Sequence, residues 1–122
     1  MIKEIEKPEI NFNFYVYDKL KFYYDEDNRE YFSETEYGSK FYFNLNGQIH
    51  RIGKPAIEYY NGDKIWRKNG KMHRLNGPAY ISRSYKDYWI NSKHYTEKKF
   101  AKETNHLICR ICGRFCRQRC FI

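Results

Sequence analysis

The chain has 122 residues and a net charge of +8, and 20% of its residues are aromatic, including 13 Tyr and 9 Phe. Its length fits one domain, and the 41% hydrophobic share is enough for a core and excludes wholesale disorder. The charged N-terminus has no apolar signal region, and no run of about 18 apolar residues occurs, so neither secretion nor a membrane span is expected. Because aromatic residues favour pleated surfaces, the composition predicts a mainly β protein.

The first segment, residues 1–36, holds ten acidic and five basic residues, for a net charge of −5. The run NFNFYVY predicts a strand, Asp18-Lys19 permits a turn, and LKFYY predicts a second strand. DEDNRE then predicts a loop before EYFSETEYG. We expect this N-terminal β segment to cap a sheet and to keep its edge from pairing freely.

A repeat fills the second segment, residues 37–95, and its copies start at Asn46, Asn69 and Asn91. The copies read NGQIHRIGKPAIEYYNGDKIWRK, NGKMHRLNGPAYISRSYKDYWI and the shorter NSKHYTEKKFAK. One hairpin of this length cannot bury its own face, so neighbouring hairpins must extend or stack on one another. A rib of aromatic side chains along the sheet is the surface expected to bind another protein: Tyr42, Tyr60, Trp66, Tyr88 and Trp89.

Turn residues punctuate the repeat. Four Asn-Gly pairs supply positive φ at both central positions and predict type I′ turns: Asn46-Gly47, Asn61-Gly62, Asn69-Gly70 and Asn76-Gly77. Pro55 and Pro78 lack a backbone N–H, so each should start a strand or lie on a sheet edge.

Three histidines, His50, His73 and His94, are expected at equivalent repeat positions. A histidine repeated by architecture more often serves architecture, so we expect each ring to bond the neighbouring repeat. A metal ladder or a catalytic histidine is the alternative. No acid recurs beside these histidines and no nucleophile stands at a suitable spacing, so the sequence predicts no enzyme.

An arginine follows each of the first two histidines. Arg51 and Arg74 are expected to stack on the aromatic rib or to pair with Glu58. The alternative is a basic rib that binds phosphate.

The pattern NG-K-x-HR-x-x-GPA, with an aromatic pair before the next NG, resembles short repeats of giant DNA virus and tailed phage proteins. Those repeats are a distant variant of MORN repeats, and the resemblance covers residues 37–100. It implies stacked antiparallel β-hairpins, a viral origin, a place in the virion or host cytoplasm, and contact with a capsid protein, host factor or other macromolecule. The chain lacks the G-x-W and H-G-x-G core of true MORN repeats, so their lipid binding is not implied.

The third segment, residues 96–122, predicts a short helix and a basic, cysteine-rich tail. Thr96 is a suitable N-cap and Glu97 suits the helix dipole, so we expect a helix over residues 97–104. All four cysteines follow within the tail: Cys109, Cys112, Cys116 and Cys120.

The cysteine spacing leaves three interpretations open. On one straight helix the first and last cysteines lie about 16 Å apart, too far to share one zinc ion, whose bonds to sulfur are about 2.3 Å. A bend at Gly113 would bring the four thiolates together, and structural zinc is the first hypothesis. Disulfides, or free thiols on a helix packed against a partner, are the alternatives.

Four arginines interleave with the cysteines and make the tail the expected contact with nucleic acid or an acidic partner: Arg110, Arg114, Arg117 and Arg119. Residues 37–122 hold eighteen basic and five acidic residues, for a net charge of +13. The first hypothesis is a non-enzymatic viral interaction or structural protein, and the alternative is a nucleic-acid-binding protein. Edge strands and the cysteine stripe also favour a homo-oligomer.

Overall fold

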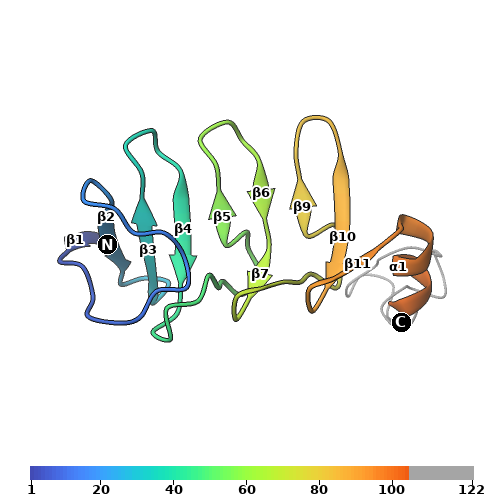
Figure 1. Ribbon diagram of the computed structural model, residues 1–122, viewed down its shortest axis with the longest axis horizontal. Helices are drawn as coiled ribbons and strands as arrows, with labels where there is room; N and C mark the ends of the chain where they lie inside the picture. Colours follow the sequence, from blue (N-terminus) through green and yellow to red (C-terminus); the bar gives the residue numbers. More distant parts are fainter. Residues whose placement is uncertain (105–122) are drawn as a thin grey trace.

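The computed structural model describes residues 1–104, and residues 105–122 lie outside the described part. Antiparallel strands form a nine-stranded sheet that extends along the long axis of the molecule, and a short helix follows the last strand (Figure 1). The elements are β1 (Ile2–Ile5), β2 (Lys21–Asp25), β3 (Glu30–Glu34), β4 (Lys40–Phe43), β5 (Ile57–Glu58), β6 (Lys64–Ile65), β7 (Arg67–Lys68), β8 (Lys71–Met72), β9 (Tyr80–Ile81), β10 (Lys86–Ile90), β11 (Lys93–Tyr95) and α1 (Glu97–Glu103). The predicted mainly β, antiparallel fold with a short C-terminal helix is confirmed.

The sheet has the strand order β1-β2-β3-β4-β5-β6-β9-β10-β11, and β7 and β8 form a separate ribbon. The hairpins β3-β4, β5-β6 and β9-β10 stand side by side with their turns on one long edge (Figure 1). We call this the tip edge, formed by residues 35–39, 59–63 and 82–85. The opposite long edge, where the chain passes from one hairpin to the next, is called the base edge.

The N-terminal segment differs from the prediction. Residues 11–17, predicted as a strand, pair with no strand of the sheet and instead pack the partly buried Phe12 and Phe14 against the core. The backbone N–H of Asn13 donates to the carbonyl of Gly47 at 2.7 Å, which fastens this segment to the base edge. The alternating aromatics have the period of a strand because every second side chain faces the sheet. The segment nevertheless packs on the face of the sheet and does not pair with a strand.

The core lies beneath this segment in two clusters. One surrounds Phe22 and Phe43, and the other surrounds Ile57 and Ile65. Phe14 packs against both clusters and joins them. Burying most of one phenylalanine side chain contributes about 1 kcal/mol, so the two partly buried rings of residues 11–17 make this segment an integral part of the fold.

The opposite face of the sheet carries its own aromatic run. Tyr23 of β2 packs on Phe32 of β3, with ring centroids 5.1 Å apart, and Phe32 packs on Tyr42 of β4 at 5.1 Å. These residues alternate with the core residues along each strand, as the period of two requires. The predicted strand starts at the two prolines are also confirmed. Pro55 and Pro78 directly precede Ala56 and Ala79, whose backbone N–H groups begin the pairing of these hairpins by donating to the carbonyls of Ile65 and Asp87.

The predicted turn type is right for one Asn-Gly pair and wrong for three. Residues 69–70 have φ of 50° and 82°, as a type I′ turn requires. At 46–47 and 61–62 only the glycine has a positive φ, and at 76–77 neither residue does. The N–H of Gly62 donates to the carbonyl of Tyr59 at 2.9 Å, so its loop is one residue longer and the glycine occupies a left-handed bulge.

Candidate functional site

Two of the repeat histidines connect neighbouring hairpins at the base edge. Nδ1 of His50 accepts a hydrogen bond from the backbone N–H of Asn69 at 2.9 Å, and Nδ1 of His73 accepts one from Asn91 at 3.1 Å. Because Asn69 and Asn91 both have left-handed φ, each ring fixes the turn that begins the next repeat. Burial, assisted by the charge of Lys68, lowers the pKa of both rings. The expectation that these rings bond the neighbouring repeat is confirmed.

The third histidine does not occupy the equivalent position, and that prediction is wrong. His94 follows the start of its copy by three residues, whereas His50 and His73 follow theirs by four. Tyr95 therefore stands in the place of the histidine. The ring of His94 instead packs on Trp89, with centroids 4.9 Å apart. The turns at 69–70 and 91–92 are both two residues long, so His94 takes the register position of Met72 and its side chain points to the other face of the strand.

The repeat arginines cover the aromatic rib. The guanidinium of Arg51 lies 3.7 Å from the ring centroid of Tyr42, and that of Arg74 lies 3.8 Å from the ring of Trp66. The predicted stacking is confirmed for both arginines. Cation–π contacts of this kind are worth about 1 kcal/mol or more when partly buried, so the arginines stabilise the repeat.

Arg51 also binds Glu30, a partner that the repeat pattern does not contain. Its Nε and Nη2 donate to the two carboxylate oxygens of Glu30 at 2.9 and 3.3 Å. Nη1 donates to the carbonyl of Pro55 at 3.2 Å and lies 3.8 Å from Glu58, which is the predicted pairing. The guanidinium is thus held by an aromatic face, two carboxylates and one carbonyl.

The five residues of the predicted aromatic face lie in different surroundings. Tyr42 and Trp66 lie beneath guanidinium groups, and Tyr42 is buried. Tyr88 stands in the equivalent place of the last hairpin, where Phe100 of α1 covers it at a centroid distance of 4.8 Å. The helix therefore takes the position that an arginine has in the earlier copies.

The remaining two residues of that predicted face lie elsewhere. Trp89 is adjacent to Tyr88 along β10 and therefore points to the other side of the strand. Tyr60 is at the tip edge, in the turn between β5 and β6. The structure does not bring the five side chains together as one exposed face.

The tip edge presents a row of exposed tyrosines. Tyr37, Tyr60 and Tyr85 are 79%, 71% and 50% exposed, one on each hairpin. The rings of Tyr37 and Tyr60 approach each other, with centroids 6.0 Å apart. Sequence reasoning missed Tyr37 and Tyr85. The available signal was a tyrosine inside a turn, next to Gly38 in the first case.

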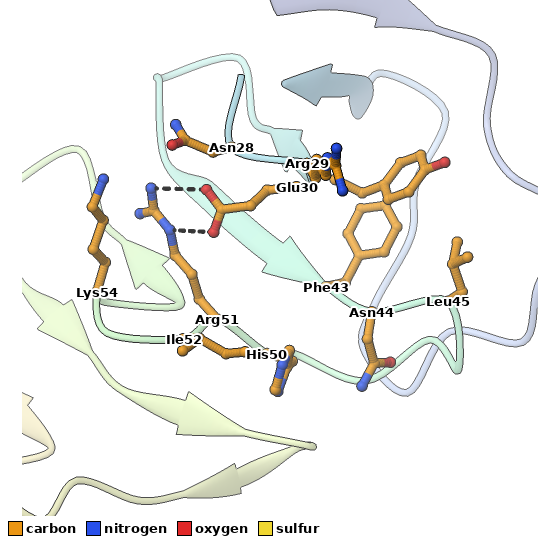
Figure 2. A pocket seen from close by; sticks show the side chains of 11 residues that line it. Asn28, Arg29, Glu30, Phe43, Asn44, Leu45, His50, Arg51, Ile52 and Lys54 are labelled. Carbon is orange, nitrogen blue, oxygen red and sulfur yellow. Dashed lines mark hydrogen bonds and ion pairs between the residues drawn. The ribbon is translucent and has the colours of Figure 1, made fainter. Parts of the chain in front are cut away.

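A depression opens at the base edge beside β3 and the loop after His50 (Figure 2). Its volume is about 410 Å³. Its lining residues are Asn28, Arg29, Glu30, Tyr31, Phe43, Asn44, Leu45, His50, Arg51, Ile52 and Lys54. The ion pair between Glu30 and Arg51 crosses the middle of this view, with Lys54 on one side and Arg29 on the other. We call this surface the base depression.

No protein family, curated protein or solved structure matches the chain.

The predicted metal ligands and the predicted contacts with nucleic acid or an acidic partner all fall in the C-terminal tail. Cys109, Cys112, Cys116 and Cys120, with the four arginines between them, all lie outside residues 1–104. Among the residues that the structure does describe, no group of three His, Cys, Asp or Glu side chains is placed to hold a metal ion.

Within the same described residues, no helix is both long enough and apolar enough to cross a bilayer.

Proposed function

We propose that the chain is a non-catalytic scaffold of β-hairpin repeats whose tip edge binds another protein. The observation that carries the proposal is the row of tyrosines at the tips. Tyr37 and Tyr60 are largely exposed, and their rings contact each other rather than the core. Tyrosine is enriched at protein interfaces because it offers a large, partly polar surface at a low cost in side-chain entropy.

Rigid turns hold these tyrosines before any partner arrives. The backbone N–H of Tyr60 donates to Oγ of Ser39 at 2.9 Å, which joins the second tip to the first. The N–H of Ser39 in turn donates to Oγ1 of Thr35 at 3.1 Å. At the third tip, Tyr85 packs on Tyr80 and hydrogen bonds to it, which raises the pKa of Tyr80 to about 12. A preorganised surface loses little conformational entropy on binding.

The histidines and the arginine that could serve an enzyme are engaged in contacts that hold the repeats together. Both Nδ1 atoms of His50 and His73 accept backbone hydrogen bonds, so neither atom is available as a general base while the bond persists. Arg51 is neutralised by Glu30. The resemblance to repeats of giant DNA viruses and tailed phages supports a viral origin, and a virion component or a host-directed factor belongs to the same proposal.

The proposal is tested by partner capture with the intact chain from cells that produce it naturally. The double variant Tyr37→Ser, Tyr60→Ser should lose about tenfold or more of the captured partner, because two interface tyrosines together contribute more than 1.4 kcal/mol. The control Tyr15→Ser removes another highly exposed tyrosine and should leave capture unchanged. Equal capture by wild type and the double variant would exclude the tip edge.

Salt dependence separates protein binding from the alternative of nucleic-acid binding. Capture through tyrosine contacts should survive moderate salt, because apolar contact dominates it. Binding of labelled DNA or RNA through the basic half of the chain would fall steeply with salt. Tight nucleic-acid binding that shows this salt slope and persists in the tip variant would favour the alternative.

We also propose that the cysteines of the C-terminal tail bind one structural zinc ion. The four cysteines have the residue type of a structural zinc site, and sharing one zinc ion would require a bend at Gly113. Native mass spectrometry under reducing conditions should give one zinc per chain, and the excess mass should disappear after chelation. A metal-free mass before chelation would favour disulfides or free thiols.

A further inference from the structure

The base depression carries two cations without partners in the described chain. Within residues 1–104, no ion pair or side-chain hydrogen bond joins Arg29 or Lys54 to another residue. Between them lies Glu30, whose carboxylate is neutralised by the two-point contact with Arg51 (Figure 2). The floor of the depression therefore does not repel an anion, and its two sides attract one.

The acidic residues of the adjacent turn between β2 and β3 are engaged elsewhere. Glu26 pairs with Lys3 at 2.6 Å, and Asp27 pairs with the amino group of Met1 at 2.7 Å. Asp25 accepts hydrogen bonds from two backbone N–H groups and one amide of its own turn, and these bonds lower its pKa. None of these carboxylates pairs with the cations of the depression.

Exposed aliphatic side chains line the same depression. Leu45 and Ile52 are 60% and 80% exposed, although each is large enough to contribute to a core. The buried ring of Phe43 lines the depression beside Leu45, whereas Ile52 lies on the side of Arg51 (Figure 2). Apolar surface beside unpaired cations suits a ligand that carries both an acidic and an aliphatic group.

The backbone at Arg29 is an independent indication of function. Arg29 has a φ of 54°, in the left-handed region that is uncommon for a residue with a side chain. Glycine or asparagine would be the unstrained choice at this point of the turn. Strained residues cluster at binding sites, where the side chain is worth the conformational cost.

We infer that the base depression binds an acidic segment of a partner protein. Carboxylates of the segment contact Arg29 and Lys54 on the two sides of the depression, and an aliphatic side chain of the segment packs against Leu45 or Ile52. The inference rests on the proposed function only in that the partner is a protein. The base depression and the tip edge share no residue, so either surface can fail its test alone.

A protein segment fits this surface better than nucleic acid does. Tyr31, Phe43 and His50 also line the depression, but none of these rings is among the exposed large hydrophobic side chains, and Phe43 is buried. The exposed apolar side chains are the aliphatic Leu45 and Ile52, which cannot stack on bases as aromatic rings do. Two cations flank a single depression, whereas a phosphate chain requires a continuous basic track.

The test is a titration of the isotope-labelled full chain, followed by the amide signals in NMR. The probe is a glutamate-rich peptide with a central leucine, and the matched peptides replace the leucine by serine or the glutamates by lysine. Shifts should be confined to the amides near residues 28–31 and 43–54. The serine peptide should bind more weakly, and the lysine peptide should not bind.

Arg29→Gly is the decisive variant, because glycine suits the observed φ and keeps the turn intact. It should weaken binding of the glutamate–leucine peptide by about fivefold or more. Arg83→Ser removes the same charge from the tip edge and should change nothing, as should the double tyrosine variant.

Three results would overturn the inference. The first is that the amide signals shift outside the base depression, and the second is that the Arg29→Gly variant binds the peptide as tightly as wild type does. The third is that single-stranded DNA displaces the peptide at a lower concentration than the unlabelled peptide itself needs.

Discussion

The imidazole of His50 accepts the backbone N–H of Asn69 at 2.9 Å, and this bond joins two successive hairpins. Replacing His50 or His73 by Ala should lower the free energy of unfolding by about 1 kcal/mol each, because a backbone N–H loses its acceptor. Urea denaturation measures the change. His94→Ala is the control, with an expected change below about 0.5 kcal/mol. An equal cost at His94 would contradict a specific role of the other two rings.

Mild acid should destabilise the protein through the same two histidines. Burial first, and Lys68 second, lower the pKa of His50 and His73 below the ordinary value of 6.5. The unfolded chain therefore takes up protons at a higher pH than the folded chain does. The free energy of unfolding should be highest above pH 6.5 and should fall as the pH drops below it.

The double variant His50→Ala, His73→Ala isolates this contribution. Urea denaturation at about pH 7.5 and about pH 5.5 should show a smaller difference for the double variant than for wild type. A pH dependence as large as that of wild type would assign the effect to other groups.

The ion pair between Arg51 and Glu30 should couple the stability of the first repeat to that of β3, which belongs to residues 1–36. Arg51→Lys is expected to cost about 2 kcal/mol, because lysine loses both the two-point contact with the carboxylate and the stacking on Tyr42. A double-mutant cycle with Glu30→Gln should give a coupling free energy of about 1–2 kcal/mol in urea denaturation. Additive effects of the two substitutions would contradict the coupling.

Two glycines of similar conformation make a matched pair of tests. Gly47 and Gly53 have φ of 79° and 76°. A Cβ at Gly47 would lie 1.8 Å from the carbonyl oxygen of Asn11, whereas nothing lies within 4 Å of one at Gly53. Gly53→Ala should cost about 1 kcal/mol for left-handed strain alone.

Gly47→Ala should cost about 2 kcal/mol more than Gly53→Ala, because it also displaces the N-terminal segment from the base edge. Urea denaturation measures both costs, and limited proteolysis should cut residues 8–17 faster in the Gly47→Ala variant only. If both variants lost the same free energy of unfolding and were cut at the same rate, residues 8–17 would not be held at the base edge through Gly47.

The sequence predicts the local features of the repeat better than its longer-range partners. The helix expected over 97–104 appears as α1, with the predicted N-cap, because Thr96 Oγ1 accepts the N–H of Lys99 at 3.2 Å. The stacking of Arg51 follows from the aromatic rib one strand earlier. Its stronger partner Glu30 is 21 residues away in the N-terminal segment, and no spacing rule connects the two positions.

The turn errors have one physical origin. Asn-Gly suits both a two-residue turn and a longer loop with a left-handed glycine, and the choice depends on the strand register. At 61–62 the pairing of Tyr59 with Asp63 requires the longer loop. Tyr37 and Tyr85 were missed for a related reason, since the edge of the sheet on which a turn lies is known only once the hairpins are aligned.

Photo-cross-linking at the tip edge tests the central claim most directly. A benzophenone amino acid placed at Tyr60 should form one dominant adduct with a partner polypeptide in cells that produce the protein. The same group at Tyr15, which is 81% exposed against 71% for Tyr60, should not form it. No protein adduct from Tyr60, or the same adducts from both positions, would contradict a scaffold that binds its partner through the tip edge.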